Sequence, residues 1–247
     1  VTPVLLGPRA AALSLLPPER PAGGIALPPV GLAAFPPEPE RFVGRLGPML
    51  RASRILAPEG AERGVIFYGM AGGGKTACGL ELAYRHERGR FAAQVWYQGP
   101  QQGPEGPPDI AGALGDLLRA IEHQLGAPDL NLGLYLDQPE QFKALVLPRL
   151  KALLEQNALL LVLDNLEHLL TDSGDWRDPL WGEVMATLAG HRGLSRVVLT
   201  SRRLPRDLQP GGALAAAIPA DPIHALSLAE SVLLARELPH LAALFAD

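Results

Sequence analysis

The stretch Gly69-Met70-Ala71-Gly72-Gly73-Gly74-Lys75-Thr76 fits the pattern G-x-x-x-x-G-K-[ST] of a phosphate-binding loop. The apolar residues 65–68 before it are typical of a buried strand. Residues 77–88 after it are rich in Ala, Leu, Glu and Arg and are typical of a helix. Because the motif requires a strand, a glycine loop and a helix in this order, we prefer it to a chance glycine-rich turn.

The glycines of such a loop let consecutive backbone N–H groups turn inward around an anion. The helix that follows points the positive end of its dipole at the same place. Lys75 adds a cation for the β- and γ-phosphates, and the Thr76 hydroxyl can bind Mg²⁺. The predicted phosphate-binding residues are Gly69, Ala71, Gly72, Gly73, Gly74, Lys75, Thr76 and Ala77.

Composition narrows the class of protein. The chain has 247 residues, of which 47% are hydrophobic and 19% charged, so it can bury a sizeable core. A net charge of −4 argues against direct nucleic-acid binding, and no apolar run reaches the length of a membrane span. The single cysteine, Cys78, cannot form an internal disulfide, so we expect a cytoplasmic location and a small buried thiol. The six histidines have no metal-ligand spacing.

A second predicted strand ends in an acid. Residues 159–163 are all Leu or Val, as in a central parallel strand with both faces covered. Asp164 stands at its carboxyl end, where open α/β sheets bind ligands, and is predicted to hold Mg²⁺ opposite Thr76, the Walker B role. An acid that only caps the strand is the alternative.

The residue that activates water is less clear from the sequence. Many related ATPases carry a second acid directly after the first, but here that position holds Asn165, a poor base. Glu167 could take over this role, or it could be a solvated helix residue; both interpretations stay open.

A third predicted strand, residues 195–202, ends in a polar tip. Arg202 could reach a γ-phosphate and sense its presence. The neighbouring Arg203 and Arg206 leave the choice among the three open, and a solvated basic turn is the alternative.

The remaining pattern completes an α/β fold, in which helices sandwich a five-stranded parallel sheet. Further strands are expected at residues 93–97 and, weakly, 213–218, with 219–225 a loop. Helices are expected at residues 46–56, 110–125, 141–156 with a kink at Pro148, 179–189 and 226–238.

The chain divides into three predicted parts. Residues 1–40 hold ten of the twenty-five prolines and indicate an extended linker. Residues 41–220 form the P-loop nucleotide-binding domain, and residues 221–247 begin a following helical region. We expect the chain to be a piece of a longer protein.

Four motifs follow one another along the chain: Phe42-Val43-Gly44-Arg45, the glycine loop, Leu161-Val162-Leu163-Asp164-Asn165 and Val197-Val198-Leu199-Thr200-Ser201-Arg202. Together they resemble the nucleotide-binding domain of STAND ATPases, the NB-ARC-like signal-transduction group among the AAA+-related P-loop enzymes, over residues 41–247. A composition rich in Ala, Gly, Leu, Pro and Arg is typical of a GC-rich bacterial source.

This resemblance implies a set of roles. Phe42 and Val43 would lie against adenine, Arg45 near the ribose or phosphates, and Arg202 would be the sensor arginine. The family holds ADP in a resting form, and exchange for ATP drives oligomerisation and switches on an attached effector, in bacteria often in defence or transcriptional signalling. An effector upstream and sensor repeats downstream are the implied partners. The helical region that completes the adenine pocket is not recognisable before Asp247.

Three other functions are alternatives to a slow ATPase switch. A nucleotide-binding scaffold without turnover agrees with Asn165 in the place of a second acid. A GTPase is disfavoured, since no Asn-Lys-x-Asp segment follows residue 164. A small-molecule kinase would need a phosphoacceptor pocket, for which the sequence offers no clear residues.

Overall fold

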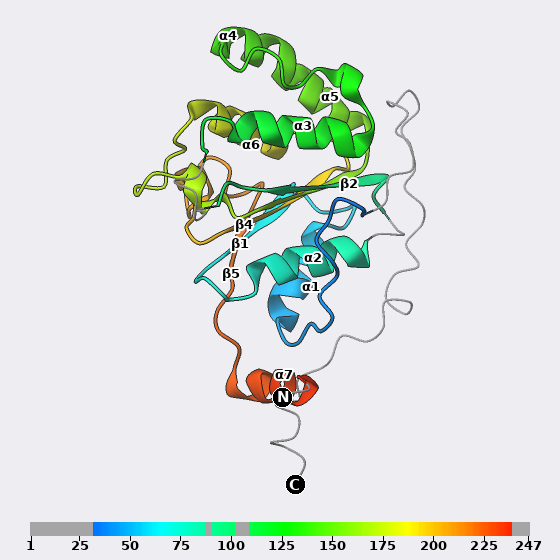
Figure 1. The fold of residues 1–247 in the computed structure, drawn as a ribbon, viewed down its shortest axis with the longest axis vertical. Coiled ribbons are helices and arrows are strands. Elements are labelled where there is room, and N and C mark those ends of the chain that lie inside the picture. Colours follow the sequence, from blue (N-terminus) through cyan, green and yellow to red (C-terminus); the bar gives the residue numbers. More distant parts are fainter. Residues whose placement is uncertain (1–31, 87–89, 102–108, 239–247) are drawn as a thin grey trace.

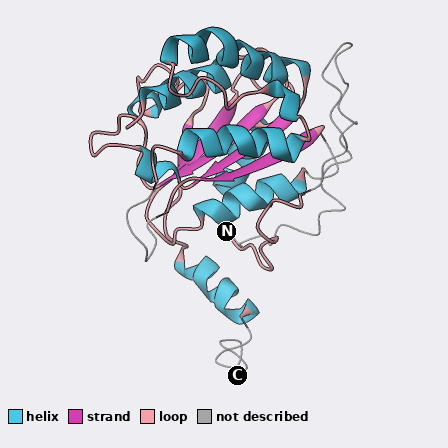
Figure 2. Cartoon of the chain, turned by 45° about the horizontal axis from the view of Figure 1, so that its top comes forward, coloured by secondary structure: helices cyan, strands magenta, loops and turns pink. Residues whose placement is uncertain are grey.

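A single parallel sheet forms the centre of the computed structural model, which describes residues 32–86, 90–101 and 109–238. The five strands pair in the order β2-β3-β4-β1-β5, and helices cover both faces (Figures 1 and 2). The strands are β1 (Gly64–Tyr68), β2 (Ala93–Gln98), β3 (Leu159–Asp164), β4 (Arg196–Ser201) and β5 (Ala220–Pro222). The predicted α/β architecture with five parallel strands between helices is confirmed.

The helices divide between the two faces of the sheet (Figure 1). One face carries α3 (Ala113–Leu125), α5 (Leu147–Gln156) and α6 (Pro179–Gly190), and the other carries α1 (Leu46–Ile55) and α2 (Lys75–Arg85). Short segments are α4 (Pro139–Gln141), the π-helical η3 (Phe142–Val146), and the 3-10 turns η2 (Pro128–Leu130), η4 (Leu166–Leu169) and η5 (Arg206–Leu208). A last helix, α7 (Leu228–Glu237), follows β5 and lies beyond α1 (Figure 1).

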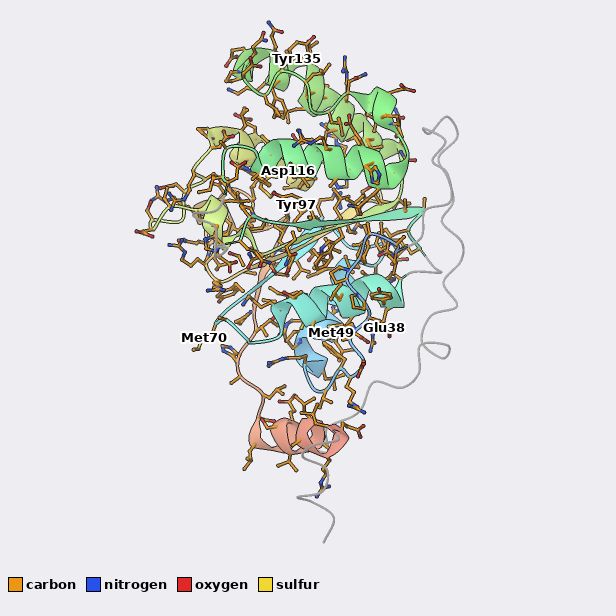
Figure 3. The ribbon with its side chains drawn as sticks, in the orientation of Figure 1. Glu38, Met49, Met70, Tyr97, Asp116 and Tyr135 are labelled. Atoms are coloured by element: carbon orange, nitrogen blue, oxygen red, sulfur yellow. The ribbon has the colours of Figure 1, made fainter. Side chains whose placement is uncertain are left out.

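Alternate residues of each strand enter different halves of the core, as the period of a strand requires. On β1, Val65 and Phe67 pack toward α1 and α2, whereas Ile66 packs toward α3 and α6. Tyr97 of β2 points toward α3, and its hydroxyl donates to the carbonyl of Ala113 at 2.9 Å (Figure 3). The continuous apolar runs of the sequence therefore arise because helices bury both faces.

A buried arginine supports the end of the sheet away from the glycine loop. Arg196, 1% exposed, donates from its guanidinium to the carbonyls of Ile55, Ala57 and Gly60 at 3.2 Å each. These carbonyls lie in and just after the last turn of α1, where intrahelical partners are missing. Burial lowers the pKa of Arg196 to about 10, so the guanidinium stays charged at neutral pH and fixes the C-terminal end of α1.

The expected helix at 141–156 is built in two geometries. A π-helical segment covers Phe142–Val146, and α5 begins directly after it at Leu147. Pro148 stands in the first turn of α5, directly after the π-helical segment. The break that the sequence suggested at Pro148 is therefore a change of helix type just before it.

The prediction of a fifth strand at residues 213–218 was wrong. These residues form helical turns, in which the Ile218 N–H donates to the Leu214 carbonyl at 2.9 Å. The strand is β5, inside the segment 219–225 that the sequence indicated as a loop, and it pairs with Ile66–Tyr68. An alanine-rich run favours helical turns, and a strand of three residues leaves too little pattern to detect.

The linker predicted at residues 1–40 lies outside the described residues, except for 32–40. Within that part, Phe35 is 8% exposed and packs on Trp96 with ring centroids 5.5 Å apart. The Tyr84 hydroxyl donates to the Pro36 carbonyl at 2.8 Å. Residues 35 and 36 are thus packed against β2 and α2.

Candidate functional site

The glycine loop joins β1 to α2 as predicted, with its backbone in conformations that favour glycine. Gly69, Gly72 and Gly74 have φ values of 143°, 72° and 88°, and Gly74 is the N-cap of α2. A Cβ on Gly69 would also collide with the carbonyl of Ile223 beside it. Ala71 keeps a negative φ, so its side chain causes no strain at this position of the loop.

Lys75 lies folded back over the loop. It is 9% exposed, and its Nζ donates to the carbonyls of Gly69 at 3.0 Å and Met70 at 2.8 Å. Burial lowers the pKa of Lys75, an effect that the nearby carboxylate of Glu167 opposes. The ammonium is therefore held at the mouth of the loop, close to the acids that end β3.

Thr76 and Asp164 are brought together, although they are far apart in the sequence. The Thr76 hydroxyl lies 2.9 Å from Oδ1 and 3.1 Å from Oδ2 of Asp164, which is 1% exposed. Burial raises the pKa of Asp164, while hydrogen bonds from Thr200 and Thr76 lower it. A hydroxyl and a carboxylate are the oxygen donors that Mg²⁺ prefers, so this pair fits that cation.

Thr200 is a member of this cluster that the sequence analysis missed. Its hydroxyl donates to Asp164 Oδ1 at 2.5 Å and accepts from the backbone N–H of Asn165 at 3.0 Å. β4 lies between β1 and β3 in the sheet, so its last residues stand between the loop and Asp164. The only sequence signal was a polar residue near the end of an apolar strand.

Glu167 is buried and paired, so the interpretation of it as a solvated helix residue was wrong. It lies in the 3-10 turn η4 and is 5% exposed. The Nε of Arg202 is 2.7 Å from Oε1 of Glu167, an ion pair without a directed hydrogen bond. The Arg202 backbone N–H donates to Oε2 at 3.2 Å. The left-handed Asn165, with φ 66°, turns the chain so that Glu167 faces β4.

The three arginines after β4 separate in the structure. Arg203 pairs with Asp172 at 3.0 Å and Arg206 pairs with Asp175 at 3.1 Å. Arg202 alone pairs with an acid of the β3 end, so it is the one of the three that faces the site.

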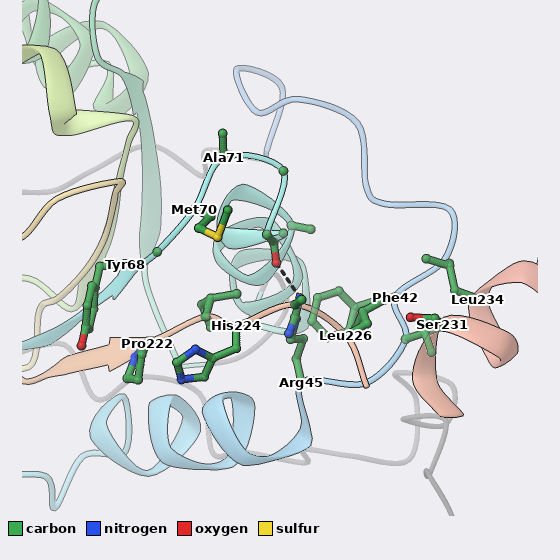
Figure 4. A pocket seen from close by; sticks show the side chains of 18 of the residues that line it. Phe42, Arg45, Tyr68, Met70, Ala71, Pro222, His224, Leu226, Ser231 and Leu234 are labelled. Atoms are coloured by element: carbon green, nitrogen blue, oxygen red, sulfur yellow. Dashed lines mark hydrogen bonds between the residues drawn. The ribbon is translucent and has the colours of Figure 1, made fainter. Parts of the chain in front are cut away.

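A cavity of about 630 Å³ lies beside the loop (Figure 4). Phe42 lines it, and Arg45 reaches from the start of α1 to donate from Nη2 to the Gly73 carbonyl at 2.6 Å. Val43 also lines it and is 8% exposed. The four motif segments that the sequence analysis singled out therefore lie at one edge of the sheet.

Further lining residues of this cavity come from the chain after β5, which the sequence analysis did not assign to the site. The residues concerned are His224, Leu226, Ser231 and Leu234 (Figure 4). The available signal was Ser227-x-x-Glu230, a capping box that marks the start of α7. The start of α7 therefore contributes to the lining of this cavity.

Cys78 is buried in α2, as expected, and burial raises the pKa of its thiol to about 12. Among the described residues, no group of three or more His, Cys, Asp or Glu is placed to hold a metal ion. No helix in the described ranges is long and apolar enough to cross a membrane.

Comparison with known proteins shows the fold. No protein-family model matches the sequence, and no curated protein matches it. Among solved structures, the crystal structure of Cdc6p from Pyrobaculum aerophilum superposes with a TM-score of 0.53 at 17% identity. The match covers 83% of this chain and 52% of that one, so this chain spans about half the length of its structural neighbour. The chain thus has an AAA+-like P-loop fold.

Proposed function

We propose that this chain is a nucleotide-binding switch module of the STAND type, which binds ADP or ATP with Mg²⁺ and hydrolyses ATP slowly. One observation carries the proposal. A lysine, a hydroxyl, two carboxylates and an arginine from three separate loops gather beside a cavity of about 630 Å³. A phosphate loop next to such a cavity is what a nucleoside polyphosphate needs.

The phosphates would lie on residues 69–77. The inward N–H groups and the N-terminus of α2 supply a positive field, and Lys75 supplies a cation. The Lys75 ammonium contacts the carbonyls of Gly69 and Met70, which places it at the loop. Thr76 and Asp164 would hold Mg²⁺, which neutralises phosphate charge when bound.

Glu167 is the proposed base for the attacking water, and Arg202 the proposed sensor of the γ-phosphate. In the structure the two are paired at 2.7 Å. An anion that attracts the Arg202 guanidinium competes with the carboxylate for it, so release of Glu167 would follow the arrival of a γ-phosphate. The same ion pair favours a second candidate, a scaffold that binds nucleotide without turnover, because Arg202 then keeps Glu167 occupied.

The adenine and ribose would occupy the cavity. Phe42, Val43, Leu226 and Leu234 offer apolar surface in its lining. Arg45, at the loop end of the cavity, would face the ribose or phosphates.

The wider assignments are part of the proposal. Residues 41–220 would be the nucleotide-binding domain, 221–247 the start of a helical region, and 1–40 the tether to an upstream effector. Downstream sensor repeats, a homo-oligomer on activation and a role in bacterial defence signalling follow from the STAND resemblance, and a cytoplasmic location follows from the single cysteine.

Binding is tested by isothermal titration of ADP and ATP, with GTP as competitor. Lys75→Ala should abolish binding because it removes the cation at the loop, whereas Lys151→Ala, at an exposed position of α5, should bind like the parent chain. Unchanged binding by Lys75→Ala would refute the assignment of the loop.

Turnover separates the switch from the scaffold. Phosphate release by the parent chain should be slow but measurable, and Glu167→Gln should lose it while still binding ATP. If the parent chain releases no phosphate, or if Glu167→Gln releases it at the parent rate, Glu167 is not the base.

A further inference from the structure

Glu230 stands where two helices meet. Its Oε2 accepts from the Ser227 backbone N–H at 2.8 Å, and the Ser227 hydroxyl accepts from the Glu230 N–H at 3.3 Å. These two bonds are the capping box of α7. The other oxygen, Oε1, accepts from the backbone N–H of Arg45 at 3.3 Å, at the N-cap of α1.

The turn that Glu230 contacts is an unusual one. Gly44 and Arg45 both have positive φ, 75° and 59°. A non-glycine residue in this conformation needs support from its surroundings. A Cβ on Gly44 would collide with the Glu230 carboxylate, so the carboxylate packs directly on the turn. No side chain of α1 itself caps this end, so Glu230 supplies the missing acceptor and a negative charge at the helix N-terminus.

The turn in its left-handed form sends the Arg45 side chain toward the glycine loop. Its Nη2 is 2.6 Å from the Gly73 carbonyl (Figure 4). The hydrogen bonds from Ser227 and Arg45 lower the pKa of Glu230, so it is a carboxylate at neutral pH. A continuous chain of contacts thus runs from α7 through Glu230 and Arg45 to the loop.

The side chains of α7 stay partly or fully exposed. None of its residues is buried, and Arg41 approaches Glu237 at 3.7 Å. Ser231 and Leu234 line the same cavity as Arg45. The Glu230 contact is therefore one that joins α7 directly to the turn before α1.

We propose that Glu230 is a positioning residue of the nucleotide site, which acts through Arg45 and couples nucleotide affinity to the docking of α7. This inference rests on the proposed function. By thermodynamic linkage, if docked α7 favours the nucleotide, the nucleotide favours docked α7 by the same factor.

The test is a double-mutant cycle on ADP affinity in the 247-residue chain. Glu230→Ala should weaken ADP about tenfold, as expected for one charge-assisted hydrogen bond. In the background of Arg45→Ala the same change should have no further effect. Ser227→Ala is the matched control, since it removes the hydroxyl cap of α7 but leaves the carboxylate on Arg45, and it should bind ADP within about twofold of the parent.

A second measurement reports on α7 itself. ADP should slow amide hydrogen exchange across residues 228–237 in the parent chain and in Ser227→Ala, but not in Glu230→Ala. Glu230→Gln, which keeps a side chain of the same size, should weaken ADP in the same direction.

The outcomes distinguish failure of the proposed function from failure of the role inferred for Glu230. If the parent chain binds neither ADP nor ATP, the proposed function fails and this inference fails with it. If the parent binds ADP and Glu230→Ala binds it equally well, or loses affinity equally in the Arg45→Ala background, only the inference is overturned.

Discussion

Replacing Thr200 by valine isolates a buried hydroxyl at the centre of the site. The side chain is 1% exposed, donates to Asp164 at 2.5 Å and accepts from the Asn165 N–H at 3.0 Å. Thr200→Val keeps the shape of the side chain and removes both hydrogen bonds.

The cost can be worked from these two bonds. A hydrogen bond to a charged group contributes about 1.5–3 kcal/mol, and a buried N–H left without a partner costs about 1–3 kcal/mol. We therefore expect Thr200→Val to lower the free energy of unfolding by about 3 kcal/mol or more, roughly a hundredfold in the unfolding equilibrium. The pKa of Asp164 should also rise further, because burial raises it and the Thr200 bond now opposes that effect.

The assay is urea unfolding at pH 7, with Thr200→Ser as the matched variant. Serine keeps the hydroxyl and loses one methyl group, which should cost about 1 kcal/mol. Mg²⁺-dependent ADP binding should weaken in Thr200→Val, and more so as the pH falls, because a protonated carboxyl does not bind the cation. If Thr200→Val is as stable as Thr200→Ser, the hydroxyl does not hold Asp164 in the way described.

Two further predictions concern the scaffold. Burial lowers the pKa of His86 to about 4, with Arg90 and Arg85 adding to the effect, so between pH 6.5 and 4 the unfolded chain binds a proton that the folded chain does not. This histidine should therefore lower stability by about 2 kcal/mol at pH 5 relative to pH 7, and His86→Leu should remove that share of the pH dependence in urea unfolding; an unchanged slope would contradict it. Gly79→Ala should raise stability by about 0.5–1 kcal/mol, because a Cβ there would meet Val162 at 3.4 Å, an ordinary contact, inside α2. A lower thermal midpoint would show that the contact between α2 and the sheet is too tight for a methyl group.

The parts of the fold that depend on local sequence pattern could be predicted. The apolar run before Asp164 could only be a strand covered on both faces, and the glycines at 72–74 required a tight loop. Positions that depend on distant partners were harder. The three-residue β5 is a strand only because it pairs with β1, which no local pattern reveals.

The site shows the same division. Lys75 and Thr76 follow from the motif, and the structure places them against Asp164, although their proposed roles await experiment. Glu167 is buried because Arg202, 35 residues later, pairs with it, and a local helical pattern around residue 167 gave the opposite impression. Thr200 matters only because β4 lies between β1 and β3, an order that spacing in the sequence does not specify.

The buried Arg196 has a mechanical consequence for the opposite end of α1. It fixes the last turn of that ten-residue helix, whose axis is about 15 Å long. Any tilt of α1 about this fixed end would displace its other end, at Arg45, the most. A tilt of about 6° would carry Arg45 by about 1.5 Å, enough to break its 2.6 Å bond to Gly73. A slight rotation between α1 and the sheet would thus reach the glycine loop through the contact between Arg45 and Gly73.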